Sequence, residues 1–162
     1  MVLRGALMED FVNYRLPSMF LIFPICATFK CGREFCQNAK LTDDPHLIVI
    51  SAHEICKQFV SNEITEAIVC GGLEPFDSVD DLLELISTLR NEFHLQNDIV
   101  IYTGYTEEEV LSDEKMRRVL DYKNIVVKYG RFIANDAARF DDVLGVTLAS
   151  SNQYAKRYNY ED

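Results

Sequence analysis

The chain has 162 residues, a length typical of one domain, and 48% of them are hydrophobic, enough for a buried core. We therefore expect a single domain over 1–162, with residues 1–18 as an extension that packs on it. Lys and Arg number 16 and Asp and Glu number 26, which gives a net charge of −10. This charge argues against nucleic acid as a partner, because binding phosphates requires a basic surface.

Membrane and secretory signals are not visible in the sequence. The longest apolar run, residues 19–27, is too short to cross a bilayer and contains Pro24. The first twenty residues carry charges and lack the apolar segment of a secretory signal. We expect a cytoplasmic protein with no membrane partner, whose five cysteines stay reduced.

The first half of the chain combines a strand, a long loop and a helix. The apolar residues 19–25 predict the first strand. Residues 26–45 form a polar loop with three cysteines, and a loop of that length suggests a function. Ser-Ala-His-Glu at 51–54 fits a capping box, which predicts a helix over 52–60.

Strands and helices alternate in the second half. Short apolar runs predict strands at residues 66–70, 98–102 and 124–128, and a further candidate lies at 146–149. Apolar residues at helical spacing predict a helix over 79–93, and Thr-Glu-Glu-Glu at 106–109 begins another. This alternation predicts an α/β fold with a mainly parallel sheet.

Glycines and polar residues follow the predicted strands. Gly71 and Gly72 come after the second strand, Thr103 and Gly104 after the third, and the cysteine loop after the first. Ligands of such folds bind beyond the carboxyl ends of the strands, and glycine lets the backbone approach a ligand closely. The three loops therefore predict a binding site, and tight turns without a ligand are the alternative.

The cysteine loop places Cys26, Cys31 and Cys36 with four residues between neighbours. Thiolates bind zinc and iron–sulfur clusters. Structural zinc needs a fourth ligand, for which His46 and His53 are available without the usual spacing. Three thiolates on a [4Fe–4S] cluster instead leave one iron open to a small molecule. Cluster, zinc and reduced structural thiols all remain open from the residues alone.

The other two cysteines have a simpler interpretation. Cys56 falls within the predicted helix over 52–60, and Cys70 ends a predicted strand. We expect both to be buried apolar thiols.

Three segments carry a family resemblance, and two C-terminal segments strengthen it. The cysteine loop follows the first strand, and "GGLEP" at 71–75 is similar to a "GGEP" motif with Leu73 inserted. "IYTGYTEEEV" at 101–110 is close to a "YTGY" segment, and "YGRF" at 129–132 followed by "SSNQ" at 150–153 resembles a C-terminal pattern. With these segments the chain resembles the radical S-adenosylmethionine (SAM) superfamily. Within it, the chain looks most like the short branch with the anaerobic ribonucleotide reductase activating proteins, including phage-type members.

The resemblance implies a fold and a chemistry. The fold is a partial (β/α) barrel with a mainly parallel sheet. The open iron of a [4Fe–4S] cluster chelates SAM, one electron breaks a carbon–sulfur bond, and the 5′-deoxyadenosyl radical abstracts a hydrogen atom. The implied partners are a glycyl radical enzyme, which donates that atom, and a small redox protein, which donates the electron. The alternatives are action on another peptide or small molecule, and a non-catalytic protein that binds a cluster or zinc.

The resemblance also assigns site residues, none of them a catalytic side chain. The metal ligands are Cys26, Cys31 and Cys36. The cofactor-binding residues are Phe35, Gly71, Gly72, Glu74, Tyr102, Thr103, Gly104 and Tyr105. The aromatic residue before the last cysteine matches the family position near adenine. The glycine-rich segment meets the methionine ammonium, and the "YTGY" segment lines the SAM pocket.

Three departures from the family pattern stand out. The family usually has three and then two residues between its cysteines, where this chain has four and four. Leu73 lengthens the "GGEP" loop, and Tyr129 replaces the usual Asp of the activating proteins.

Overall fold

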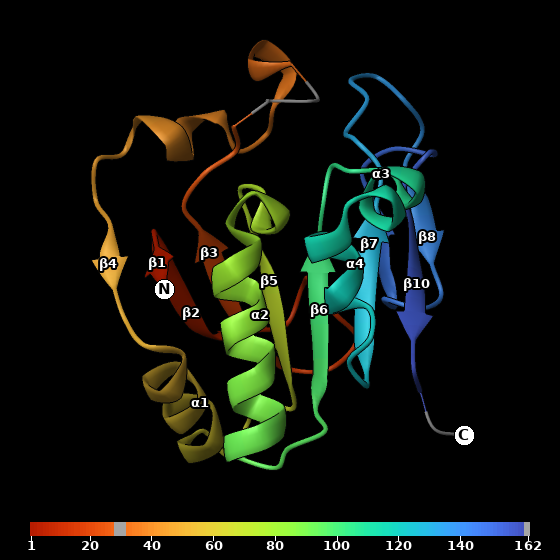
Figure 1. Ribbon diagram of the computed structural model, residues 1–162. Helices are drawn as coiled ribbons and strands as arrows, with labels where there is room; N and C mark the ends of the chain where they lie inside the picture. Colours follow the sequence, from red (N-terminus) through yellow and green to blue (C-terminus); the bar gives the residue numbers. More distant parts are fainter. Residues whose placement is uncertain (28–31, 161–162) are drawn as a thin grey trace.

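The computed structural model describes residues 1–27 and 32–160 of the chain. At its centre lies a six-stranded sheet with the order β10-β7-β6-β5-β3-β2 (Figure 1). The four inner strands are parallel: β3 (Ser18–Phe23), β5 (Ala67–Gly72), β6 (Asp98–Tyr102) and β7 (Ile125–Tyr129). The two edge strands, β2 (Gly5–Asp10) and β10 (Tyr154–Tyr158), run antiparallel to their neighbours.

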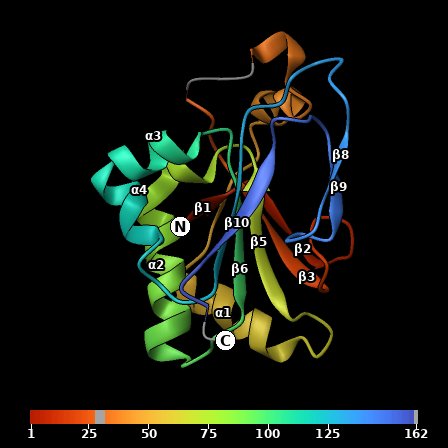
Figure 2. The same ribbon diagram turned by 90° about the vertical axis from the view of Figure 1, so that its right-hand side faces the viewer.

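Helices cover one face of this sheet. They are α1 (Ala52–Ser61), α2 (Val79–Ser87), α3 (Glu107–Ser112) and α4 (Glu114–Val119), and a π-helical turn, η4 (Thr88–Glu92), extends α2. The hairpin of β8 (Arg139–Asp141) and β9 (Val146–Leu148) lies on the opposite side of the sheet from α2, α3 and α4 (Figure 2).

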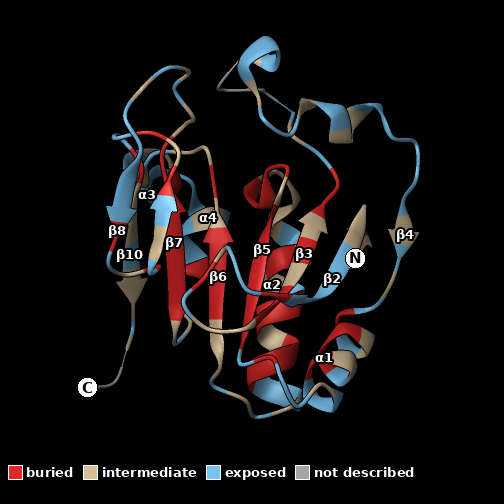
Figure 3. Ribbon diagram, turned by 180° about the vertical axis from the view of Figure 1, so that it is seen from behind, coloured by how far each residue is buried: buried red, intermediate tan, exposed pale blue. Residues whose placement is uncertain are grey.

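The alternation of side chains along the strands makes two apolar cores. On the helical face, Leu21, Cys70 and Ile101 belong to one buried cluster with residues of α1 and α2. On the other face, Val69 and Val100 pack in a second cluster with residues from the N-terminal loop and the β8–β9 hairpin. Both faces of the inner strands are thus covered, which explains their nearly continuous apolar sequences. Figure 3 shows this contrast between the buried inner strands and the exposed edge strand β2.

The predicted fold class is confirmed as a mixed α/β fold with a mostly parallel sheet. A barrel is not confirmed, because the described strands form an open sheet that ends at β2 and β10. The prediction for residues 1–18 was incomplete, since they supply the edge strand β2 and also β1 (Val2–Leu3), which pairs with β4 (Ile48–Val49). The predicted strand at 146–149 exists as β9 but lies in the separate hairpin, and β10 was missed.

The predicted helix starts have clear local causes. The Ser51 side chain accepts a hydrogen bond from the Glu54 backbone N–H at 3.1 Å and caps α1. Thr106 and Glu109 form a reciprocal capping box at the start of α3. The long cysteine loop contains two short 3-10 helices, η1 (Arg33–Phe35) and η2 (Ala39–Asp43). In the described ranges, none of the helices is long and apolar enough to cross a membrane.

The two glycines of "GGLEP" are the last residues of β5 and do not follow it. A Cβ atom on Gly71 would lie 2.9 Å from the ring of Phe20, and one on Gly72 would lie 2.6 Å from a methyl group of Ile22. Gly72 also has a φ of +83°. The close approach of β3 side chains therefore accounts for both glycines without a ligand.

Candidate metal and cofactor site

The three predicted loops meet at one cavity of about 540 Å³ beyond the carboxyl ends of the parallel strands. From the predicted set its lining includes Cys26, Cys36, Gly72, Glu74, Tyr102, Thr103 and Gly104. This volume is typical of pockets that hold one small-molecule cofactor. A cavity therefore lies at the carboxyl ends of the strands, where the sequence predicted a binding site.

The cavity lies against the face of the sheet that the helices leave free. Phe20, Ile22 and Tyr102 line it from the strands, and Val12 and Leu148 line it from the N-terminal loop and from β9. Its lining thus combines apolar side chains from the sheet and the hairpin with polar side chains, several of them from the surrounding loops.

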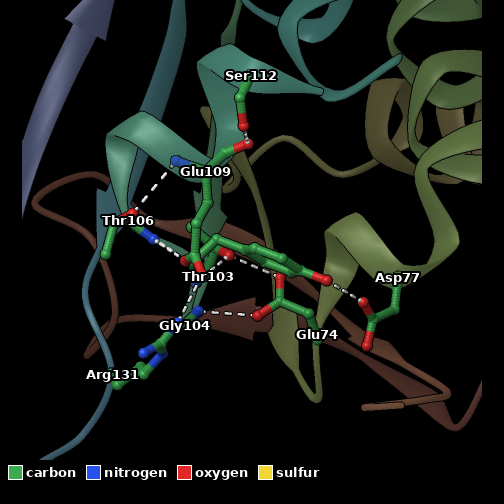
Figure 4. Close-up of polar contacts among 9 residues, drawn as sticks. Glu74, Asp77, Thr103, Gly104, Thr106, Glu109, Ser112 and Arg131 are labelled. Carbon is green, nitrogen blue, oxygen red and sulfur yellow. Dashed lines mark hydrogen bonds and ion pairs between the residues drawn. The ribbon is translucent and has the colours of Figure 1, made fainter. Parts of the chain in front are cut away.

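Glu74 joins two of the predicted loops from within the protein. Its Oε1 accepts hydrogen bonds from the Thr103 hydroxyl at 2.7 Å and from the Phe76 backbone N–H at 3.2 Å. Its Oε2 accepts a hydrogen bond from the Gly104 backbone N–H at 2.8 Å (Figure 4). The carboxylate therefore fixes "GGLEP" to "YTGY", while its 6% exposed side chain still lines the cavity.

Burial dominates the electrostatics of this carboxyl group. Loss of solvent raises the pKa of Glu74 from 4.5 to about 7, although the hydrogen bonds from Gly104, Thr103 and Phe76 oppose the shift. A bound cation beside it would favour the ionised form.

A buried cation faces the same cavity. Lys128, on β7, is only 7% exposed and lines the cavity. Its Nζ donates a hydrogen bond to the Gly130 carbonyl oxygen at 3.0 Å and lies 5.9 Å from the centre of the Tyr102 ring. Glu74 and Lys128 thus give one cavity a carboxylate and an ammonium group.

The described loop cysteines are suited to hold a metal centre. Cys26 and Cys36 both line the cavity and are partly exposed. By contrast, Cys56 and Cys70 are buried, and desolvation raises the pKa of both thiols, that of Cys56 to about 12. Cys31 lies outside the described residues, and within those residues no three His, Cys, Asp or Glu side chains form a metal site. The donor set present fits two of the three predicted thiolate ligands.

Three predicted cofactor-binding residues lie away from this cavity. Gly71 is buried within β5, where it packs against Phe20. The Tyr105 hydroxyl donates a hydrogen bond to Asp77 Oδ1 at 2.7 Å. Phe35 is 55% exposed and lines a second cavity. Their predicted roles in SAM binding stay predictions.

The second cavity, of about 750 Å³, adjoins the first through Gly130, Arg131 and Phe132, which line both. Tyr129 also lines it, because alternation along β7 turns Tyr129 to the helical face and Lys128 to the first cavity. The Tyr129 hydroxyl lies 2.8 Å from that of Tyr158. The residue that replaces the family's Asp is therefore built into the helical core.

Sequence reasoning missed Lys128 and Asn38, both in the cavity wall. Lys128 ends the predicted strand over 124–128, and a charged residue at the carboxyl end of a buried strand was an available signal. Asn38 lies two residues after Cys36, and a loop amide carries no comparable signal.

Comparison with known families agrees with this geometry. A model of the family described as "4Fe-4S single cluster domain" matches residues 21–154. The chain belongs to this family. The family is part of a radical SAM-associated clan, so membership supports a [4Fe–4S] cluster. No curated protein matches the chain.

Among the metals that the sequence left open, the family thus favours iron–sulfur over zinc. The matched segment begins within β3 and ends at the start of β10, so it contains the cysteine loop and both segments that Glu74 joins.

Proposed function

We propose that this protein binds a [4Fe–4S] cluster and SAM in the first cavity, cleaves SAM reductively and generates a glycyl radical on a partner protein. The observation that supports SAM binding is that one acidic and one basic side chain line the same cavity as the cysteines. Glu74 and Lys128 are both buried and line the cavity with Cys26 and Cys36.

The proposed ligand explains why both charges are needed. The methionine part of SAM carries an ammonium and a carboxylate, which need partners of opposite sign in a cavity with little water. Glu74 offers the carboxylate, and Lys128 offers the ammonium. The apolar walls from Phe20, Ile22 and Leu148 suit the adenosine part.

In this proposal Cys26, Cys36 and Cys31 hold the cluster. When bound and reduced, the cluster supplies the electron that reductive cleavage of SAM requires. The protein binds and orients SAM through Glu74 and Lys128, which line the cavity beside Cys26 and Cys36. A small redox protein is the proposed source of the electron.

The proposed hydrogen donor is a glycine of an anaerobic ribonucleotide reductase-like protein. Two features support a protein substrate. The first cavity is assigned to the cluster and SAM, and the second cavity opens beside it through Arg131 and Phe132. Among the described residues that line this second cavity, Arg131 is the one with a formal charge, in a chain with a net charge of −10. A neutral backbone segment of a partner is compatible with such a lining.

The test begins with cluster loading without oxygen. We expect about one four-iron cluster per chain, with Cys26→Ala and Cys36→Ala each losing most of the iron and sulfide. Cys56→Ala is the matched control, because that thiol is buried away from the cavity, and it should keep the cluster. Tight zinc without iron or sulfide would contradict the cluster assignment.

Cluster-loaded protein is then reduced and mixed with SAM. The expected product is 5′-deoxyadenosine, measured by chromatography. With an anaerobic reductase added, electron paramagnetic resonance should show a glycyl doublet that requires SAM. A verified cluster without SAM binding would refute the enzyme proposal, whereas SAM cleavage without a doublet would refute only the proposed partner.

A further inference from the structure

The cysteine loop is fastened at two places, next to Cys26 and two residues after Cys36, to a single segment, residues 72–77. At its start, the Glu74 backbone N–H donates a hydrogen bond to the Ile25 carbonyl oxygen at 2.8 Å, and the Ala27 N–H donates one to Asp77 Oδ2 at 2.6 Å. These two contacts flank Cys26 on either side. Cys26 is therefore held at a fixed place relative to that segment.

The part of the loop that follows Cys36 is fastened by a side chain. Asn38 Nδ2 donates a hydrogen bond to the Gly72 carbonyl oxygen at 2.6 Å. Cys36 lies two residues earlier, where its N–H donates to the Arg33 carbonyl oxygen at 3.3 Å and its own carbonyl accepts from the Ala39 N–H at 3.2 Å. Because these turns order the short stretch of chain between the two residues, anchoring Asn38 also restrains Cys36.

The segment that receives these contacts is itself rigid. The Glu74 carboxylate is bonded to Thr103 and Gly104, and Asp77 Oδ1 accepts the Tyr105 hydroxyl. The Asp77 N–H also donates to the Glu74 carbonyl oxygen at 3.1 Å. The segments that carry both described cysteines are thus bonded to the same residues, which also join the ends of β5 and β6.

We infer that Asn38 is a positioning residue for the iron–sulfur centre: its bond to the Gly72 carbonyl oxygen holds the part of the loop that carries Cys36, as Asp77 holds the part that carries Cys26. The inference rests on the proposed cluster. Contacts outside the cysteine motif therefore hold the two segments that carry Cys26 and Cys36.

The test compares variants of cluster-loaded protein. In Asn38→Ala the Gly72 carbonyl loses its donor and the loop loses an anchor, so a chelator should remove iron roughly five- to tenfold faster. The signal of the reduced cluster in electron paramagnetic resonance should also shift. Asn38→Gln keeps an amide donor and should restore at least half of the lost resistance to the chelator.

Asn97→Ala is the matched control. Asn97 Nδ2 donates to the Glu66 carbonyl oxygen at 3.0 Å, the same type of contact at the opposite end of the sheet. It should leave the cluster signal and the iron release unchanged. An Asn38→Ala protein that matches the wild type would overturn the inference, and so would equal iron loss in Asn97→Ala or no recovery in Asn38→Gln. If the wild type takes up no cluster, the cluster proposal itself fails.

Discussion

Among the described residues, each end of the parallel sheet buries one cationic side chain, and the surroundings of the two differ. At the amino end, Arg90 is 7% exposed and donates hydrogen bonds to the carbonyl oxygens of Leu95, Asn97 and Lys123, at 2.8 to 3.2 Å. These carbonyls belong to the turns that lead into β6 and β7. The Arg90 side chain therefore links the backbone turns at this end of the sheet to one another.

At the carboxyl end, Lys128 is equally buried but lines a cavity. Its acceptor, the Gly130 carbonyl oxygen, also receives a hydrogen bond from Gln153 Nε2 at 3.3 Å. The backbone there does not depend on the lysine alone. The comparison indicates that Arg90 stabilises the turns of the fold, whereas Lys128 lies in the wall of a cavity.

The largest expected effect is at the closed end. Arg90→Met leaves three partly buried carbonyl groups without these donors, and each lost contact of this kind costs about 1–3 kcal/mol. We expect a loss of at least about 3 kcal/mol in the free energy of unfolding, measured by urea denaturation of the cluster-free protein.

Arg118→Met is the matched control, because Arg118 is exposed on α4, and it should change stability by less than about 0.5 kcal/mol. An Arg90→Met protein within 1 kcal/mol of the wild type would remove the basis of the comparison.

The sequence predicted the closed framework of this fold better than its open features. The inner strands and the capped helices follow from local patterns, such as the run at 98–102, which forms β6 with the same bounds. The meeting of three loops at one edge was also predicted, since it depends on parallel topology alone.

Other features depend on contacts between distant residues. Strand β10, with the sequence Tyr-Ala-Lys-Arg-Tyr, does not alternate apolar and charged residues, and its pairing with β7 decides its structure. Gly71 and Gly72 were interpreted as a ligand loop, although Phe20 and Ile22 on the neighbouring strand require them. The same dependence hid Asn38, whose acceptor lies 34 residues away.

The raised pKa of Glu74 makes the stability of the open end of the sheet depend on pH. Burial raises this pKa from 4.5 to about 7. Between pH 4.5 and pH 7, the folded protein therefore keeps a proton on Glu74 that the unfolded protein has lost. The associated stabilisation is fully present below pH 4.5 and is lost as pH rises through 7. The change amounts to at most about 3 kcal/mol.

Urea unfolding of cluster-free wild type and Glu74→Gln at pH 5 and pH 8 measures this effect. The stability of the wild type relative to the variant should fall at the higher pH, because the amide does not titrate. A difference that is constant with pH, or that grows as pH rises, would show that the carboxylate is ionised throughout this range.

The third prediction separates binding from folding at the open end. Lys128→Met removes a buried charge but keeps an apolar chain of similar length, and Gln153 still donates to the Gly130 carbonyl. We therefore expect unfolding free energy within about 1 kcal/mol of the wild type. Binding of SAM to cluster-loaded protein should weaken about tenfold or more, because a charge-assisted hydrogen bond contributes about 1.5–3 kcal/mol.

Calorimetry of SAM binding, with unfolding measured on the same samples, tests both halves of this prediction. Lys115→Met is the matched control, since Lys115 pairs with Asp80 between two helices on the covered face and should leave SAM affinity unchanged. Unchanged affinity in Lys128→Met would place the ligand's carboxylate elsewhere. A loss of stability as large as that of Arg90→Met would mean that Lys128 also stabilises the fold. The effect of Lys128→Met on SAM affinity could then not be separated from its effect on folding.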